Sequence, residues 1–224
     1  MDNKTKKNTN DKIDKNELSN ALNNVLSKPT SLKEKINLSD LLELKRALNP
    51  INNMITKELT IKFIKNLKNI FANTPGSIPN ELKNTDELLK DNAAVNVNAN
   101  GYDFFKNPII AEVKANIPYA GNKYGASQKS GLTKDINGLL DAKEKKGGDK
   151  HELSLKDYYK FLVILDYNRY DDSSSVHYSS SDAVEEFKKS YEKKYNLNDK
   201  LVILDINKPV KLDKDHVYIV KLKL

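Results

Sequence analysis

The 224-residue chain contains no cysteine. Disulfides, thiolate zinc sites and cysteine nucleophiles are therefore excluded. The sequence also lacks a run of about 18 apolar residues, and no short apolar stretch follows the N-terminal lysines. We therefore expect neither a membrane span nor a secretory signal, and a cytoplasmic location follows as the default expectation.

Histidine and glycine are also arranged in ways that argue against two common kinds of site. The three histidines, His151, His177 and His216, lie far apart and lack the spacing of metal ligands, so each is interpreted as a surface or strand residue. The sequence has no glycine-rich loop of the type that cradles phosphate, and Gly147 with Gly148 indicates the end of a helix. Carboxylates and lysines therefore remain as the candidate catalytic groups.

Positive charge is in excess. The chain has 38 Lys and Arg against 31 Asp and Glu, a formal net charge of +7 and a pI near 9.2. This balance favours a polyanionic partner, because each phosphate that a lysine or arginine neutralises releases a condensed counterion. A soluble, lysine-rich protein without such a partner explains the charge as well.

The N-terminal third divides into a tail and a helical region. Residues 1–16 contain five lysines and only Met1 and Ile13 as large apolar side chains, which predicts a disordered basic tail or a basic arm along DNA. Residues 17–74 have helical spacing and form a predicted region for dimerisation or DNA contact, with Ser39 or Asp40 as a helix cap. Its apolar stripes are Leu18, Leu22, Val25 and Leu26; Leu41, Leu42, Leu44 and Leu48; and Ile61, Ile64, Leu67 and Phe71. Its lysines Lys62, Lys65 and Lys68 are interpreted as a solvated face or a face against the DNA backbone.

Residues 75–224 form the predicted core, beyond a break at residues 74–79 that contains two prolines and a glycine. Strand patterns at residues 102–105, 109–115, 161–165, 201–204 and 217–224 alternate with helical patterns at residues 132–140 and 182–195. Ser181 or Asp182 is the predicted cap of the last helix, and residues 173–181 are predicted to be a polar loop. The two runs that end in Val-Ile-Leu-Asp are predicted to be central strands. The fold class is therefore α/β or α+β, with a central mixed β-sheet flanked by helices.

One segment, residues 100–116, sets charged side chains into an apolar strand. Side chains alternate along a strand, so Glu112 and Lys114 share a face. If Lys106 and Asn107 form a two-residue hairpin turn, Asp103 pairs with Ile110 and lies on that same face, diagonal to Glu112. A four-residue loop keeps Asp103 on this face, whereas a three-residue loop without a bulge places it on the other. The alternative is an exposed salt-bridging pair on an edge strand.

Two carboxylates on adjacent strands repel each other, and a hard divalent cation between them removes that repulsion. Magnesium is the natural candidate. A nearby lysine can hold or deprotonate an attacking water and stabilise charge on a phosphate. Asp103, Glu112 and Lys114 therefore predict a hydrolytic site for phosphodiesters.

These residues resemble the PD-(D/E)XK nuclease superfamily, to which most type II restriction endonucleases belong. The resemblance spans roughly residues 80–224, and Tyr102 stands where the name-giving proline would be. It implies a restriction-endonuclease-like fold, one or two Mg²⁺ ions held at Asp103, Glu112 and Val113, and Lys114 as the catalytic lysine. A third acid from a helix before the sheet is common in the superfamily, and Glu81 or Glu87 is the candidate.

A polar segment after this strand supplies the candidate DNA contacts, as similar glutamine-containing segments occur in restriction-type nucleases. A helix start with polar residues explains the same segment. The candidates are Asn116, Lys123, Gln128, Lys129 and Lys134.

The resemblance therefore leads us to expect a type II restriction endonuclease that acts as a bacterial cytoplasmic homodimer on a palindromic double-stranded site, beside a companion DNA methyltransferase. A repair or structure-specific nuclease with the same centre is one alternative. A non-catalytic basic DNA-binding protein, in which Asp103 and Glu112 are structural, is the other.

Overall fold

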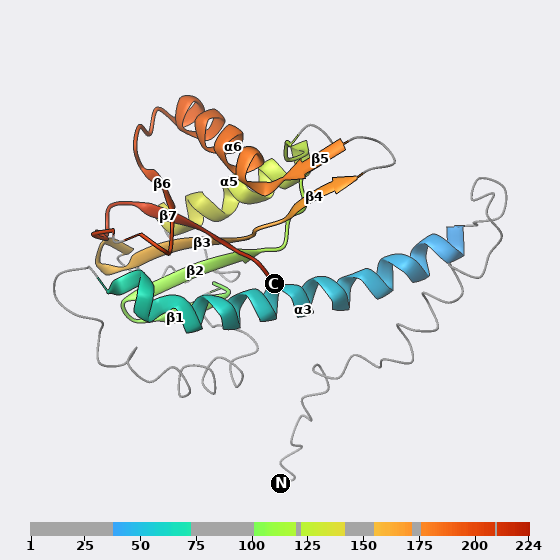
Figure 1. Ribbon diagram of the computed structural model, residues 1–224, viewed down its shortest axis with the longest axis horizontal. Coiled ribbons are helices and arrows are strands. Elements are labelled where there is room, and N and C mark those ends of the chain that lie inside the picture. Colours follow the sequence, from blue (N-terminus) through green and yellow to red (C-terminus); the bar gives the residue numbers. More distant parts are fainter. Residues whose placement is uncertain (1–37, 73–100, 120–121, 142–154, 172–175, 209) are drawn as a thin grey trace, which may run out of the picture. The chain divides into compact units, whose positions relative to one another are not determined.

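The computed structural model describes residues 38–72, 101–119, 122–141, 155–171, 176–208 and 210–224 (Figure 1). The chain divides into two compact units, Met1–Ile55 and Thr56–Leu224. The division falls inside α3 (Leu38–Phe71), a helix of 34 residues. The predicted tail, the stripe that begins at Leu18 and the break at residues 74–79 lie outside the described residues.

The second unit is built on a mixed sheet, as the sequence predicted. The strand order is β1-β2-β3-β7-β6, in which β1 is antiparallel to β2 and the other neighbours are parallel. β3 is buried along almost its whole length because its apolar residues face covered layers on both sides of the sheet. The strands are β1 (Phe104–Lys106), β2 (Ile109–Lys114), β3 (Tyr159–Leu165), β6 (Leu201–Leu204) and β7 (Val217–Leu222).

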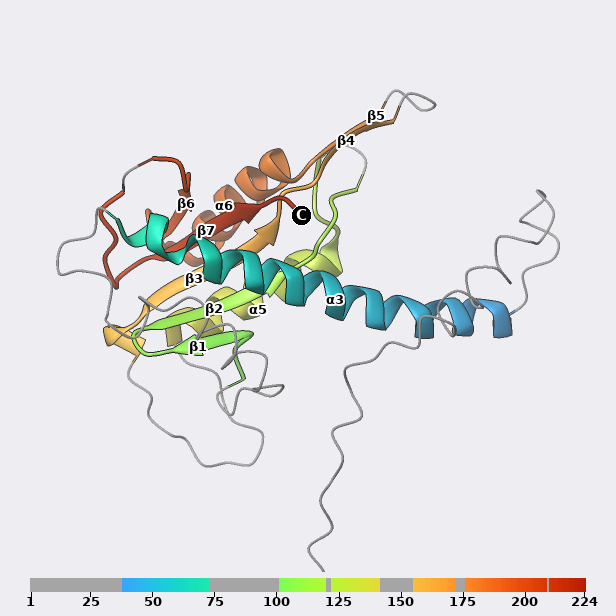
Figure 2. The same cartoon turned by 60° about the horizontal axis from the view of Figure 1, so that its bottom comes forward.

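Helices cover both faces of this sheet (Figure 2). On one face, α5 (Ala126–Asp141) and α6 (Ser180–Tyr195) bury Leu132 and Val184 against Ile110 and Leu162 of the strands. On the other face, Phe63 of α3 contacts the rings of Phe104 and Phe161, with centroids 5.9 and 5.2 Å away. Residues 56–71 of α3 are therefore a layer of the second unit, although they were grouped with the N-terminal helical region on sequence grounds.

Strand order corrects one prediction. The runs that end in Val-Ile-Leu-Asp form β3 and β6, but only β3 is central. β7 pairs with β3 and leaves β6 at the edge of the sheet, where Val202 and Ile203 are half-buried. Two similar local sequences thus occupy different environments because a later strand inserts between them.

The serine-rich stretch between β3 and α6 also differs from the predicted loop. β4 (Asn168–Asp171) and β5 (Val176–Ser179) pair antiparallel, because Val176 and Tyr178 favour extended backbone. α6 begins earlier than predicted: Ser179 is its cap, and the Ser179 hydroxyl accepts the Asp182 backbone N–H at 3.2 Å. A short 3-10 turn, η2 (Leu155–Asp157), precedes β3.

None of the helices in the described ranges combines the length and apolar character needed to cross a lipid bilayer.

The docking of α3 on the sheet predicts a large effect for one substitution. Phe63→Ala removes a fully buried ring between two others, so we expect it to lower the free energy of unfolding by about 3–5 kcal/mol in urea denaturation. Lys62→Ala is the matched control on the exposed side of the same turn, and its change should stay within about 0.5 kcal/mol. A loss below about 1 kcal/mol for Phe63→Ala would mean that this part of α3 does not belong to the core.

Candidate active site at the edge of the sheet

The hairpin that carries the site turns one residue later than predicted. Asn107 and Pro108 form the two-residue turn, joined by a cis peptide bond, and Lys106 pairs with Ile109. The reason is that Pro108 has no backbone N–H to give to a ladder, so pairing begins after it. Phe105, and not Asp103, pairs with Ile110.

This corrected register keeps Asp103 on the predicted face. Extending the observed pairs by one step sets Asp103 opposite Glu112 instead of diagonal to it. Phe104 faces α3, so its neighbours Asp103 and Phe105 are on the α5 side, where Phe105 packs against the core cluster. The later turn moves the partner of Asp103 by two residues, from Ile110 to Glu112. A shift of two residues leaves a side chain on the same face of the sheet, so the predicted face is unchanged.

Asp103 is itself anchored to β2. Its Oδ2 accepts the backbone N–H of Val113 at 2.8 Å. β1 begins at Phe104, so the side chain of Asp103, one residue before the strand, takes the place of the next backbone acceptor in the ladder. Three residues are predicted to hold metal. Two of them, Asp103 and Val113, are therefore joined by a hydrogen bond, and the third, Glu112, is the residue before Val113.

Glu112 and Lys114 share the face of β2 that is turned toward α5. Glu112 is only 2% exposed, whereas the Lys114 side chain is 28% exposed. The Lys114 Nζ lies 3.5 Å from Glu112 Oε2. The pair is thus partly buried beneath a helix, and the alternative of a fully exposed salt bridge does not describe it.

A third carboxylate, absent from the predicted site, completes the group. Asp135 Oδ2 lies 3.2 Å from Lys114 Nζ, and Asp135 is 9% exposed. The sequence contained a sign of its burial: Leu132, Ile136 and Leu139 form the buried stripe of α5, and Asp135 is three residues after the first of them. A buried carboxylate needs a charged or hydrogen-bonding partner, so a carboxylate on an apolar stripe indicates a polar site. The third acids predicted before, Glu81 and Glu87, lie outside the described residues.

Electrostatics hold Lys114 in its charged form. Burial lowers the pKa of its ammonium, but the carboxylates of Asp135, Asp103 and Glu112, with the Asp135 hydrogen bond, outweigh burial and raise the pKa above its usual value. A lysine of this kind donates hydrogen bonds and positive charge. It is poorly suited to remove a proton from water near neutral pH.

A pocket of about 310 Å³ opens beside these residues. Four of the predicted site residues line it, together with Asp135 and the helix glycine Gly131. The complete lining is Lys114, Asn116, Ser127, Gln128, Gly131, Leu132, Lys134 and Asp135. β2 and α5 thus bring the predicted catalytic lysine and three predicted DNA contacts to one cavity.

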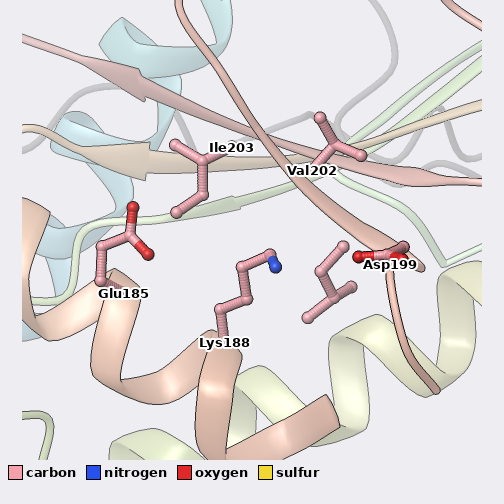
Figure 3. Close-up of a pocket in the computed structure, with 6 residues that line it drawn as sticks. Glu185, Lys188, Asp199, Val202 and Ile203 are labelled. Carbon is pink, nitrogen blue, oxygen red and sulfur yellow. The ribbon is translucent and has the colours of Figure 1, made fainter.

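A second cavity, of about 330 Å³, lies between α6 and the β6 edge (Figure 3). Glu185 and Lys188 approach it from α6, and Val202 and Ile203 from β6. β6 and β2 are separated by β3 and β7 in the sheet, so this cavity is distinct from the predicted site.

The predicted DNA contacts have different surroundings. The Gln128 Oε1 accepts the Gly125 N–H at 3.0 Å, and its Nε2 donates to the Ile117 carbonyl at 2.9 Å, so this side chain caps α5 and ties it to the segment after β2. Lys129 is paired with Glu186 of α6 at 2.9 Å. Lys134 and Lys123 are exposed, and Asn116 is half-buried.

The donor set fits a hard cation in ligand type and charge. Three carboxylates and one ammonium carry a net charge of −2 when ionised, which is the charge that one Mg²⁺ neutralises. In the present arrangement, however, Glu112 and Asp135 point to the Lys114 ammonium, and no trio of His, Cys, Asp or Glu in the described parts of the chain is arranged to hold a metal ion.

Comparison with known proteins adds no family: no family model, no curated protein and no solved structure matches the chain.

The space beside Gly131, in the wall of the first pocket, leads us to expect that one substitution there is stabilising. A Cβ at Gly131 would meet no atom within 4 Å. Gly131→Ala should therefore raise the free energy of unfolding by about 0.5–1 kcal/mol, because alanine is the better helix former. Urea denaturation checks this, and a loss of stability would show that the space beside α5 is filled.

Proposed function

We propose that the chain is a magnesium-dependent endonuclease of the PD-(D/E)XK type, with a restriction-endonuclease-like fold. The observation that carries the proposal is the arrival of Asp103, Glu112 and Lys114 at one edge of a mixed sheet, on the face turned toward α5. The helices on both faces of the sheet and the pocket beside Lys114 support it further.

In this proposal Asp103 and Glu112, with Val113, would hold Mg²⁺. When bound there, the ion would supply a water of lowered pKa and polarisation of the phosphorus centre. Lys114 would present its ammonium to the phosphate and stabilise the negative charge that grows there as the water oxygen bonds to phosphorus and the bond to the leaving oxygen breaks. The proton of the attacking water passes to solvent, and the leaving oxygen takes a proton from solvent. The raised pKa of Lys114 favours this role over that of a general base.

Double-stranded DNA is the proposed substrate. The net charge of +7 favours a polyanion, and Lys134 and Asn116 lie in the same pocket as Lys114. We infer a type II restriction enzyme that cuts a palindromic site as a homodimer, since a two-fold symmetric protein matches a two-fold symmetric target. A bacterial cytoplasm and a companion DNA methyltransferase belong to the same proposal, and a repair or structure-specific nuclease remains the catalytic alternative.

A second candidate is a non-catalytic DNA-binding protein. The observation that favours it is that every acid of the group has a partner within the chain: Asp103 accepts the Val113 N–H, while Glu112 and Asp135 contact Lys114. These contacts alone account for a stable structural cluster.

DNA cleavage separates the candidates. We expect the protein to cut a long mixed-sequence DNA into discrete fragments with Mg²⁺ but not with EDTA, and Lys114→Ala to lower the single-turnover rate by at least roughly 100-fold, because it removes charge stabilisation at the phosphate. The products are resolved on a gel.

The matched control for charge is Lys208→Ala, an exposed lysine after β6 at the opposite edge of the sheet, which should cut as the unaltered chain does. A smear with the same requirements would favour the repair nuclease over the restriction enzyme. Intact DNA with a shifted mobility would overturn the catalytic proposal and support the binding protein.

Metal binding has a readout that does not need cleavage. Mg²⁺ at about 100 times its dissociation constant should raise the melting temperature by roughly 5–10 °C, because binding to the folded state alone stabilises it by about 2.7 kcal/mol. Glu112→Gln should abolish the shift. Asp199→Asn, a change beside the second cavity, should retain the shift. Loss of the shift in Asp199→Asn alone would show that the metal binds near Asp199 and not at Glu112.

A further inference from the structure

The Lys114 ammonium is held from two different elements. Glu112 lies two residues before Lys114 on the same strand, with its Oε2 at 3.5 Å, and Asp135 reaches across from α5 with its Oδ2 at 3.2 Å. A lysine side chain carries about 2 kcal/mol of rotamer entropy, so it keeps one position only where partners restrain it. The shorter of the two contacts is the one from the helix.

Asp135 is in turn placed by a helix with two anchors to the strands of the site. The Tyr102 hydroxyl, on the residue before Asp103, donates to the Gly138 carbonyl at 2.8 Å in a buried position. At the other end of α5, Gln128 binds the Ile117 carbonyl, three residues after Lys114. The segment before β1 and the segment after β2 are thus both hydrogen-bonded to α5.

A further contact anchors the same helix to α6. The Tyr191 hydroxyl donates to Asn137 Oδ1 at 2.6 Å, two residues beyond Asp135. With Leu132, Ile136 and Leu139 buried, α5 has little freedom to move its Asp135 carboxylate. The buried carboxylate is consequently a fixed point for the more exposed lysine.

We propose that Asp135 is the positioning residue for Lys114: it directs the ammonium into the pocket between β2 and α5, where the substrate phosphate would lie. The proposal rests on the proposed nuclease function and adds to it a residue outside the predicted motif. Asp135 acts through Lys114 and does not itself contact the phosphate.

The test compares Asp135→Asn, which keeps the shape of the side chain and removes its charge, with Asp141→Asn, an exposed acid at the end of the same helix. The first readout is the ¹³C NMR signal of the Lys114 ε-methylene in full-length protein labelled at lysine, assigned by its disappearance in Lys114→Arg. We expect Asp135→Asn to move this signal to the position of exposed lysines, and Asp141→Asn to leave it unchanged.

The second readout is single-turnover cleavage at saturating Mg²⁺. Asp135→Asn should lower the rate by about 10- to 100-fold, the usual effect of removing a group that orients a catalytic residue, with DNA affinity in Ca²⁺ changed less than threefold. Asp135→Glu should recover most of the rate, because it restores a carboxylate from the same helix position. The NMR spectrum of each variant also reports whether the fold is kept.

Each outcome decides the proposal. An unchanged Lys114 signal in Asp135→Asn would overturn it whether or not the chain cuts DNA. A shifted signal with an unchanged cleavage rate would also overturn it, as would a variant that needs more Mg²⁺ but reaches the full rate, since Asp135 would then be a metal ligand. If the unaltered chain does not cut DNA, the proposed function fails, while the NMR comparison still decides whether Asp135 holds Lys114.

Discussion

The alternation of side chains along β2 is the constraint on which the site depends. Ala111 and Val113 face α3, and Ile110, Glu112 and Lys114 face α5. Because both faces of the sheet are covered, the charged pair cannot turn to water without exposing apolar neighbours. The strand therefore fixes which helix supplies partners for Glu112 and Lys114, and that helix is α5.

The covered position changes the electrostatics of the group. Glu112 and Asp135 are buried and Lys114 is only partly so, which brings two carboxylates close to one ammonium in a medium that screens poorly. Asp103 is exposed and adds its charge from the solvent side. The pKa of Lys114 rises although burial alone would lower it. Two buried carboxylates against one ammonium leave a net charge of −1, which is costly to maintain for stability alone, and this cost is a physical argument for a cation or a ligand at the site.

The two flanks of the site are fastened to the same helix. Tyr102 stands where a proline would complete the PD-(D/E)XK pattern, and its hydroxyl reaches the Gly138 carbonyl of α5. Gln128, a predicted DNA contact, forms hydrogen bonds with Gly125 and Ile117 within the chain. Tyr102 and Gln128 thus hold α5 against the strands that carry Asp103, Glu112 and Lys114. Asn116 and Lys134 line the pocket itself.

Local pattern in the sequence determined the strands β2, β3, β6 and β7, the two helices α5 and α6, and the common face of Glu112 and Lys114, because side-chain periodicity depends only on neighbours along the chain. The face of Asp103 depended in addition on the length of the turn that pairs β1 with β2. Tertiary structure alone decided that β7 separates β3 from β6, that α3 forms a layer of the sheet's unit, and that Asp135 meets Lys114. These depend on contacts between segments far apart in sequence: Asp135 reaches Lys114 only because α5 packs back across β2, and periodicity along one segment carries no record of its partner.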